Sequence, residues 1–250
     1  MSKNQPLIYA IIPARGGSKS IPKKNLLKIG GYPLVAYSII AAKLAKKIDR
    51  VIVSTDSEEI AEVAKKYGAE VPFLRPKEFS GDNSPDHEFV IHALEWFKKN
   101  EKRVPDYLVH LRPTSPLREP EKIDAAVQLI LKHPEATSLR SAHKIDVVPQ
   151  KCFALESGFF VGLFPNDKRP DYHNLPRQSF PPTYKPDGYV DVLKTSFVLE
   201  NPVIHGPKIL AFLSPDTGDI DSLSDLAYVD KVLKQQSFVA FNYLKNNFTS

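Results

Sequence analysis

Apolar and polar positions along this chain follow two different periods. Short apolar runs rich in β-branched residues have the length of buried strands, and the longer stretches between most of them repeat apolar residues every three or four positions, as amphipathic helices do. The predicted strands are 7–12, 50–55, 106–111, 136–141, 189–193 and 209–213, and the predicted helices are 34–47, 56–67, 84–100, 119–133 and 222–234. Strands that alternate with helices indicate an α/β fold with a mostly parallel sheet.

The length of 250 residues suits one α/β domain with a sizeable core, and we expect residues 1–250 to form it. The alternation stops between about 142 and 188, where proline and aromatic residues are frequent and the extended runs are short, such as 158–164. A long irregular segment inside a compact domain usually covers a site or contacts another chain. We therefore expect this small segment to cover a substrate and to join two subunits.

Composition and charge indicate a soluble protein with an anionic ligand. Hydrophobic residues make up 42% of the chain, and no apolar stretch approaches the roughly 20 residues that a membrane span needs. A single cysteine agrees with a reducing compartment, so we expect a cytoplasmic protein without a membrane partner. The first 50 residues contain ten Lys/Arg and one acidic residue, whereas the net charge of the whole chain is only +5. This concentration of positive charge would attract an anion.

The positive charge surrounds a loop that follows the first predicted strand. Residues 13–25 read Pro-Ala-Arg-Gly-Gly-Ser-Lys-Ser-Ile-Pro-Lys-Lys-Asn. Gly16 and Gly17 can adopt backbone angles that other residues avoid, so their N–H groups can turn toward an oxyanion. The cations and the hydroxyl of the loop that suit a phosphate are Arg15, Ser18, Lys19, Lys23 and Lys24.

Two common phosphate loops do not match this segment. A P-loop requires a Gly-Lys-Ser/Thr triplet, and here Ser18 separates Gly17 from Lys19. The dinucleotide fingerprint Gly-x-Gly-x-x-Gly is also absent, because Gly16 and Gly17 are adjacent. The sequence therefore argues against a P-loop NTPase and against a Rossmann dehydrogenase.

The motif at 12–25, Ile-Pro-Ala-Arg-Gly-Gly-Ser-Lys-x-Ile-Pro-x-Lys-Asn, resembles the signature of the CMP-sugar synthetases, the cytidylyltransferases that activate N-acetylneuraminic acid and related nonulosonic acids. The resemblance implies a three-layer, nucleotidyltransferase-like (Rossmann-like) fold and a homodimer. It also implies CTP and a nonulosonic acid as substrates and Mg²⁺ as cofactor. Arg15 and Lys24 would be catalytic. The further nucleotide and phosphate contacts that it implies are Ala14, Ser18, Lys19, Asn25, Arg75, Asp82 and Ser84.

An acidic pair lies near the other end of the chain. Asp219 and Asp221 follow the strand predicted at 209–213, at the edge of a parallel sheet where ligands bind. In extended backbone, residues two positions apart point to the same side, so both carboxylates can share one hard cation. By spacing alone, Asp221 could instead cap the last helix. The family resemblance implies that both residues bind Mg²⁺ and that Asp221 takes part in catalysis.

The loop at 112–118 reads Arg-Pro-Thr-Ser-Pro-Leu-Arg and follows another predicted strand. It resembles the family's Gln-Pro-Thr-Ser-Pro-Leu-Arg, which implies substrate contacts from Arg112, Thr114 and Ser115. Arg112 stands where sialic acid synthetases keep a glutamine that is associated with the sugar. An arginine donates hydrogen bonds but accepts none, so we expect a nonulosonic acid other than plain N-acetylneuraminic acid, with legionaminic- or pseudaminic-type sugars as the best candidates.

Three cations of the segment at 142–188 match family positions near the sugar carboxylate. The resemblance implies that they bind substrate, in part from the partner subunit. These residues are Lys151, Arg177 and Lys185.

Three alternatives stay open. The sugar could be the eight-carbon acid Kdo, although that branch typically has a tyrosine where this chain has Gly16. A nucleotide-sugar-dependent glycosyltransferase would share the fold and an Asp-x-Asp, but its acidic pair normally follows a mid-chain strand. A nucleic-acid-binding module would explain the basic N-terminal part, but no basic stripe with interleaved aromatic residues accompanies it, so we expect no nucleic-acid partner.

Overall fold

The computed structural model describes residues 5–18, 21–215 and 218–249. A six-stranded sheet with the order β10-β6-β9-β5-β1-β4 forms its centre. All these strands run in one direction except β9, which is antiparallel to both of its neighbours. The prediction of a mostly parallel sheet is therefore confirmed. The strands are β1 (Ile8–Pro13), β4 (Arg50–Ser54), β5 (Tyr107–His110), β6 (Ser138–Ile145), β9 (Thr183–Lys194) and β10 (Ile209–Leu213).

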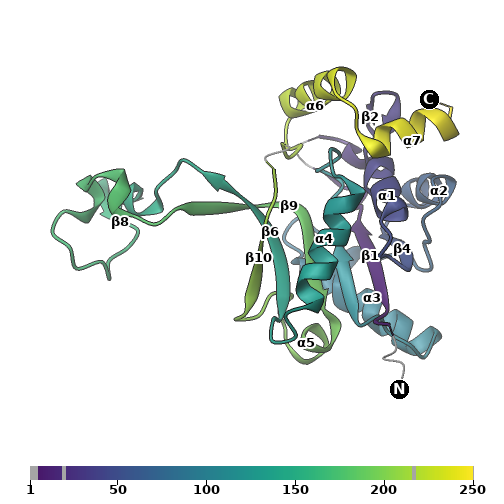
Figure 1. Cartoon of the computed structure of the whole chain (residues 1–250), viewed down its shortest axis with the longest axis horizontal. Coiled ribbons are helices and arrows are strands. Elements are labelled where there is room, and N and C mark those ends of the chain that lie inside the picture. The colour runs from purple at the N-terminus through teal and green to yellow at the C-terminus, as the bar shows by residue number, and fades with distance from the viewer. Residues whose placement is uncertain (1–4, 19–20, 216–217, 250) are drawn as a thin grey trace.

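Helices cover both faces of this sheet, so the fold has the three layers that were predicted (Figure 1). Because side chains alternate along a strand, β1 serves two cores: Ile8, Ala10 and Ile12 face one, and Tyr9 and Ile11 face the other. The helices on the first face are α1 (Leu34–Leu44), α2 (Glu58–Lys66), α4 (Pro120–Leu131), α6 (Leu223–Gln235) and α7 (Val239–Asn247). Those on the second face are α3 (Asp86–Asn100) and α5 (Thr195–Glu200).

The segment at 142–187, which we call the arm, projects from the body (Figure 1). The outer parts of β6 and β9 form a two-stranded ribbon, in which Ala142 pairs with Pro186 and Ile145 with Thr183. Beyond the ribbon lies a hairpin of β7 (Phe153–Glu156) and β8 (Phe159–Gly162). The sequence predicted irregular chain with only short extended runs here, and β8 lies within the run predicted at 158–164. Ser157 and Gly158 both have positive φ, 49° and 87°, and such a two-residue turn is a recognised hairpin connection.

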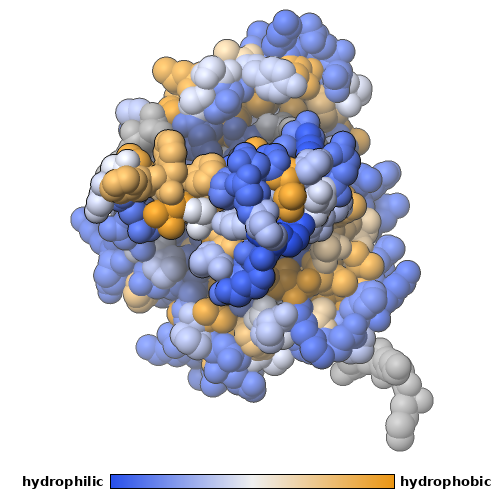
Figure 2. Space-filling view, turned by 90° about the vertical axis from the view of Figure 1, so that its left-hand side faces the viewer, coloured by the Kyte–Doolittle hydropathy of each residue, from blue (hydrophilic) through white to orange (hydrophobic). Residues whose placement is uncertain are grey.

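The arm exposes large apolar side chains. Leu155, Phe159 and Phe160 are 70%, 75% and 76% exposed. Figure 2 faces the end of the arm and shows hydrophobic residues gathered on one part of it beside strongly polar ones. Contiguous apolar surface of this kind commonly marks a protein–protein contact.

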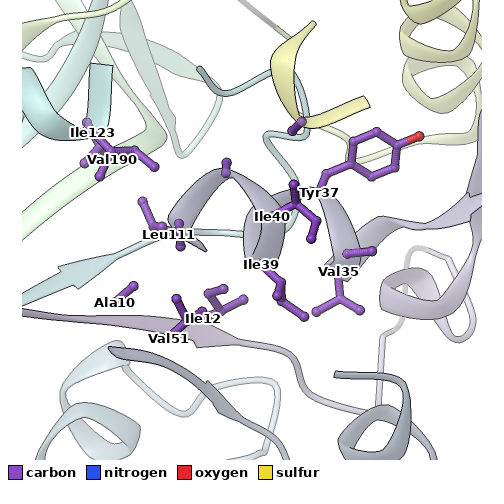
Figure 3. Close-up of a cluster of buried hydrophobic side chains, with 14 of the residues drawn as sticks. Ala10, Ile12, Val35, Tyr37, Ile39, Ile40, Val51, Leu111, Ile123 and Val190 are labelled. Atoms are coloured by element: carbon purple, nitrogen blue, oxygen red, sulfur yellow. The ribbon is translucent and has the colours of Figure 1, made fainter. Parts of the chain in front are cut away.

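Helix α1 is buried on every side. Each residue from Leu34 to Ala42 is buried, because α7 packs on α1 and the sheet lies on its other side. A helix that is apolar all round needs such enclosure. Figure 3 shows Ile39 of this helix pointing toward Ile12 and Val51 of the sheet, and Ile40 beside Tyr37 in the same cluster. This core supports the strand ends from which the site is built.

Candidate functional site

A cavity of about 590 Å³ lies at the carboxyl ends of β1 and β5. The segments that line it are far apart in sequence: the basic loop after β1, the chain around the start of α3, the loop after β5, and the acidic segment before α6. Of the predicted site residues, those that line it are Arg15, Ser18, Lys24, Asn25, Arg75, Asp82, Ser84, Arg112, Thr114 and Asp221.

The basic loop is held in place by its own polar groups. The N–H of buried Ala14 donates to the carbonyl of Ser54 at 3.0 Å, which prolongs the pairing of β1 with β4. The buried Asn25 donates from Nδ2 to the carbonyl of Arg15 at 2.9 Å. These bonds close the loop over the strand end, so its side chains can face one cavity. Lys19 lies outside the described residues.

The glycines of this loop act differently from the prediction. The N–H of Gly16 donates to Asp56 Oδ1 at 2.8 Å, and neither Gly16 nor Gly17 has a positive φ. A Cβ on Gly16 would lie 3.1 Å from the Cβ of Ser57, so glycine here permits the close approach of the loop to the start of α2. The expectation that both N–H groups turn to a phosphate is therefore wrong for Gly16, because a carboxylate already accepts its hydrogen bond.

Two cations connect the basic loop to other walls of the cavity. Arg15 Nη1 donates to the carbonyl of Gly81 at 2.8 Å and lies 3.1 Å from Asp82 Oδ1. Lys24 Nζ donates to the carbonyl of Ile220 at 2.8 Å and lies 3.4 Å from Asp221 Oδ1. Both side chains retain solvent-exposed surface, so an anion in the cavity can contact them.

Arg75 forms a buried, charged part of the wall. It is 6% exposed, and its guanidinium donates to the carbonyl of Ser54 at 2.6 Å and lies 4.8 Å from the ring centre of Phe89. Burial lowers the pKa of Arg75 to about 10, which still leaves it charged at neutral pH. Nearby, Ser84 Oγ donates to the carbonyl of Glu78 at 3.0 Å. The wall thus presents a fixed cation beside an aromatic ring.

The loop after β5 is attached to a bulge in β9. Arg118, only 1% exposed, donates to the carbonyl oxygens of Arg112 at 2.9 Å and Gly188 at 3.1 Å. Burial lowers its pKa to about 10. Ser115 is buried as well and donates from Oγ to the carbonyl of Asp187 at 3.3 Å, so it supports the loop and does not line the cavity.

The acidic pair has one member on the cavity. Asp221 lines it with a side chain that is 76% exposed, whereas Asp219 is absent from the lining. Ile220 between them is fully buried, and its N–H donates to the carbonyl of Thr114 at 3.0 Å. Ser222 caps α6, which decides against Asp221 as the cap. Within the described part of the chain, no three His, Cys, Asp or Glu side chains are grouped closely enough to hold a metal by themselves.

The predicted sugar-binding cations of the arm do not reach the cavity of their own chain. Lys151 Nζ donates to the carbonyl of Leu175 at 2.8 Å, and Arg177 Nη2 lies 2.5 Å from Asp146 Oδ1. Lys185 is exposed on β9. If these residues bind substrate, they must bind it in a neighbouring subunit.

Sequence reasoning missed several residues of the site. Asp86 and Phe89 line the cavity from the first turn of α3, and Asp187 lies under the loop after β5. Asp86 follows Ser84-Pro85, a pair that signals the start of a helix. A helix that starts beside the end of a strand places its first residues near a ligand, and this was the clue in the sequence to Asp86.

Among the described residues, no helix combines the length and the apolar character that crossing a membrane requires.

The chain is similar to known cytidylyltransferases. A family model described as Cytidylyltransferase matches residues 9–154. A CMP-N,N'-diacetyllegionaminic acid synthase of Legionella pneumophila is 33% identical, with 91% of this chain and 96% of that protein covered. A pseudaminic acid cytidylyltransferase of Campylobacter jejuni is 32% identical, with 92% and 98% covered. In fold, the chain resembles a CMP:2-keto-3-deoxy-manno-octonic acid synthetase complexed with CTP, with a TM-score of 0.67, 17% identity, and 92% and 99% of the two chains covered.

Proposed function

Because this chain belongs to the cytidylyltransferase family, we propose that it transfers the CMP group of CTP to the anomeric hydroxyl of a nonulosonic acid. The oxygen of that hydroxyl forms a bond to the α-phosphorus, the bond between the α- and β-phosphates breaks, pyrophosphate leaves, and the hydroxyl proton is released. The observation that carries this proposal is the convergence of Arg15, Lys24 and Asp221 on one cavity.

The residues of the basic loop serve the triphosphate. Such a transfer needs little covalent chemistry from the protein, so catalysis depends on positioning and on neutralising phosphate charge. Arg15 and Lys24 supply positive charge, and Ser18 and Asn25 offer hydrogen-bond donors from the same loop. Lys19, which carries a further positive charge in the sequence, is proposed to assist.

The carboxylates near the C-terminal end suit a divalent metal. Mg²⁺ prefers oxygen ligands and usually combines one or two carboxylates with water and substrate phosphates. Asp221 fits this requirement because it lies on the cavity beside a phosphate-binding cation, and we propose that Asp219 joins it. When bound, Mg²⁺ would neutralise charge on the phosphate oxygens.

We assign the remaining walls of the cavity to the two other parts of the substrates, the cytidine of CTP and the sugar. We assign Arg75, Asp82 and Ser84, with the backbone of Ala14, to the cytidine part of CTP. Arg112 and Thr114 are assigned to the sugar, and buried Ser115 supports their loop. The two relatives named for diacetyllegionaminic and pseudaminic acid support the proposal that the sugar is of this type.

We further propose a homodimer built through the arm, with residues 1–250 as one domain. The exposed apolar side chains of the β7–β8 hairpin would be covered by the second subunit. In such a dimer Lys151, Arg177 and Lys185 can supply positive charge to the partner's sugar site, which they do not reach in their own chain. We also propose a cytoplasmic location, because a single cysteine suits a reducing compartment.

Release of pyrophosphate from CTP tests the proposed function. We expect release that requires both a divalent metal and a nonulosonic acid, with formation of the CMP-sugar detected by mass spectrometry. Pyrophosphate release without a sugar acid, or no release with N-acetylneuraminic, legionaminic, pseudaminic acid or Kdo, would contradict the proposal. A preference for Kdo would keep the reaction and change the sugar class.

A further inference from the structure

Two oppositely charged side chains meet on the wall assigned to the sugar. Arg112 Nη2 lies 2.5 Å from Asp86 Oδ2, and both residues line the cavity. Their side chains are 35% and 28% exposed, so the pair is half-buried and still accessible to a ligand. Arg112 comes from the loop after β5, and Asp86 from the first turn of α3.

The pair is supported from behind. The backbone carbonyl of Arg112 accepts a hydrogen bond from the buried Arg118, and the Arg112 side chain lies directly against Gly188. A Cβ on Gly188 would lie 2.5 Å from Arg112 Cδ, so the absence of a side chain there creates the space that Arg112 occupies. Arg112 is therefore held at its backbone and along its side chain, which fixes the direction of its guanidinium.

Each partner has hydrogen-bonding capacity left after the pair forms. In the described ranges of the chain, the Asp86 carboxylate accepts only from Arg112, so Oδ1 can accept from a ligand. Over the same ranges, the Arg112 guanidinium donates only through Nη2 to Asp86, so Nη1 and Nε can still donate. The wall therefore offers donors beside an acceptor.

We propose that Asp86 and Arg112 together recognise a secondary amide of the sugar, an inference that rests on the proposed function. The carbonyl oxygen of an acetamido group accepts from the Arg112 guanidinium, and its N–H donates to Asp86 Oδ1. A hydroxyl must donate to Asp86 and accept from Arg112 through one oxygen atom, whereas a secondary amide carries its donor and its acceptor on two different atoms, and so fits a donor and an acceptor that belong to separate side chains. A buried polar group left unpaired by the wrong ligand is the usual origin of strong discrimination.

The alternative role for Arg112, binding of the sugar carboxylate, fits this geometry less well. Asp86 offsets the charge of the guanidinium at 2.5 Å, and a second carboxylate on the same guanidinium would be repelled by the first. An uncharged amide carries no such penalty. The pair is therefore better suited to a neutral group than to an anion.

Replacement of one amide N–H by oxygen tests the proposal. The probes are N,N'-diacetyllegionaminic acid and two analogues in which one acetamido group, at C5 or at C7, becomes an acetoxy group. Both groups keep the carbonyl, but only the amide can donate. We expect wild type to lose about tenfold in kcat/KM with one of the two analogues, and Asp86→Ala to lose this difference while the KM for CTP stays unchanged.

Two variants serve as controls. Asp86→Asn keeps an acceptor oxygen and should keep part of the discrimination, whereas Glu95→Ala removes an exposed carboxylate from the same helix and should change nothing. Thermal unfolding of each variant verifies that it folds. If wild type treats all three sugars alike, or if Asp86→Ala lowers kcat/KM equally for amide and ester, the pair does not recognise an amide. No turnover by wild type with any nonulosonic acid would instead refute the proposed function.

Discussion

Lys24 Nζ lies 3.4 Å from Asp221 Oδ1, although the two residues are 197 positions apart in the chain. The contact joins the basic loop after β1 to the acidic segment before α6. Because Asp221 is mostly exposed, an ion pair of this kind contributes little to stability. Its importance is positional, since it places a cation suited to phosphate beside a carboxylate suited to a metal.

Lys24→Ala should lower kcat/KM for CTP by about a hundredfold, because a charged contact to the reacting phosphates is lost. The neighbouring Lys23→Ala is a matched control, since Lys23 is exposed and pairs with Glu59 at 2.7 Å outside the cavity. Steady-state kinetics with varied CTP measure both. Equal effects of the two substitutions would show that Lys24 acts only through general charge.

Asp221→Asn should remove most turnover and weaken metal binding, because an amide is a poorer ligand for Mg²⁺ than a carboxylate. Binding of Mn²⁺, followed by electron paramagnetic resonance in the presence of CTP, gives a readout that does not depend on turnover. Thermal unfolding should stay the same because the side chain is 76% exposed. Unchanged Mn²⁺ affinity would contradict the assignment of Asp221 as a ligand.

An active site shared between two subunits predicts complementation. Asp221→Asn and Arg177→Ala chains should each be poorly active alone, and their mixture should recover part of the activity, since some mixed dimers hold one intact site. Phe159→Asp on the exposed hairpin should yield monomers by light scattering. A wild-type monomer at working concentration, or no recovery despite proven subunit exchange, would exclude this arrangement.

Gly188→Ala should raise the KM for the sugar and leave the KM for CTP nearly unchanged. The added Cβ would lie 2.5 Å from Arg112 Cδ and would displace that side chain. Gly158→Ala controls for backbone strain, because Gly158 also has a positive φ, 87°, but among the described residues, apart from its two chain neighbours, no atom lies within 4 Å of a Cβ there. If the two substitutions change sugar kinetics alike, contact with Arg112 is not the cause.

Protonation of His110 should destabilise the protein in mild acid. Burial lowers the pKa of this histidine from 6.5 to about 4. Between pH 6.5 and about 4 the unfolded chain binds a proton that the folded protein does not bind. The free energy of unfolding therefore has its full value above pH 6.5 and falls by on the order of 3 kcal/mol as the pH drops toward 4. Urea unfolding at several pH values should show a smaller fall for His110→Phe, and the exposed His133→Asn should behave like wild type.

The local pattern of apolar and polar residues was sufficient to predict most helices and strands outside the arm. The strand predicted at 209–213 is β10 with the same bounds, and the helix predicted at 222–234 is α6 shifted by one residue. Helices α5 and α7 were not predicted, and β6 and β9 extend into the arm beyond their predicted ends. These extensions stabilise each other by pairing, and a strand that depends on a distant partner has little signal in its own residues.

The motif at 12–25 determined the family by itself, because the groups that we propose to contact one phosphate chain are neighbours in sequence and their spacing is readable. Only the tertiary structure decided which distant groups meet. The antiparallel direction of β9 and its bulge at Gly188 bring the arm's base against Arg112, and the start of α3 brings Asp86 to the same side chain. Such contacts depend on strand order and on the packing of separate segments, which no local period encodes.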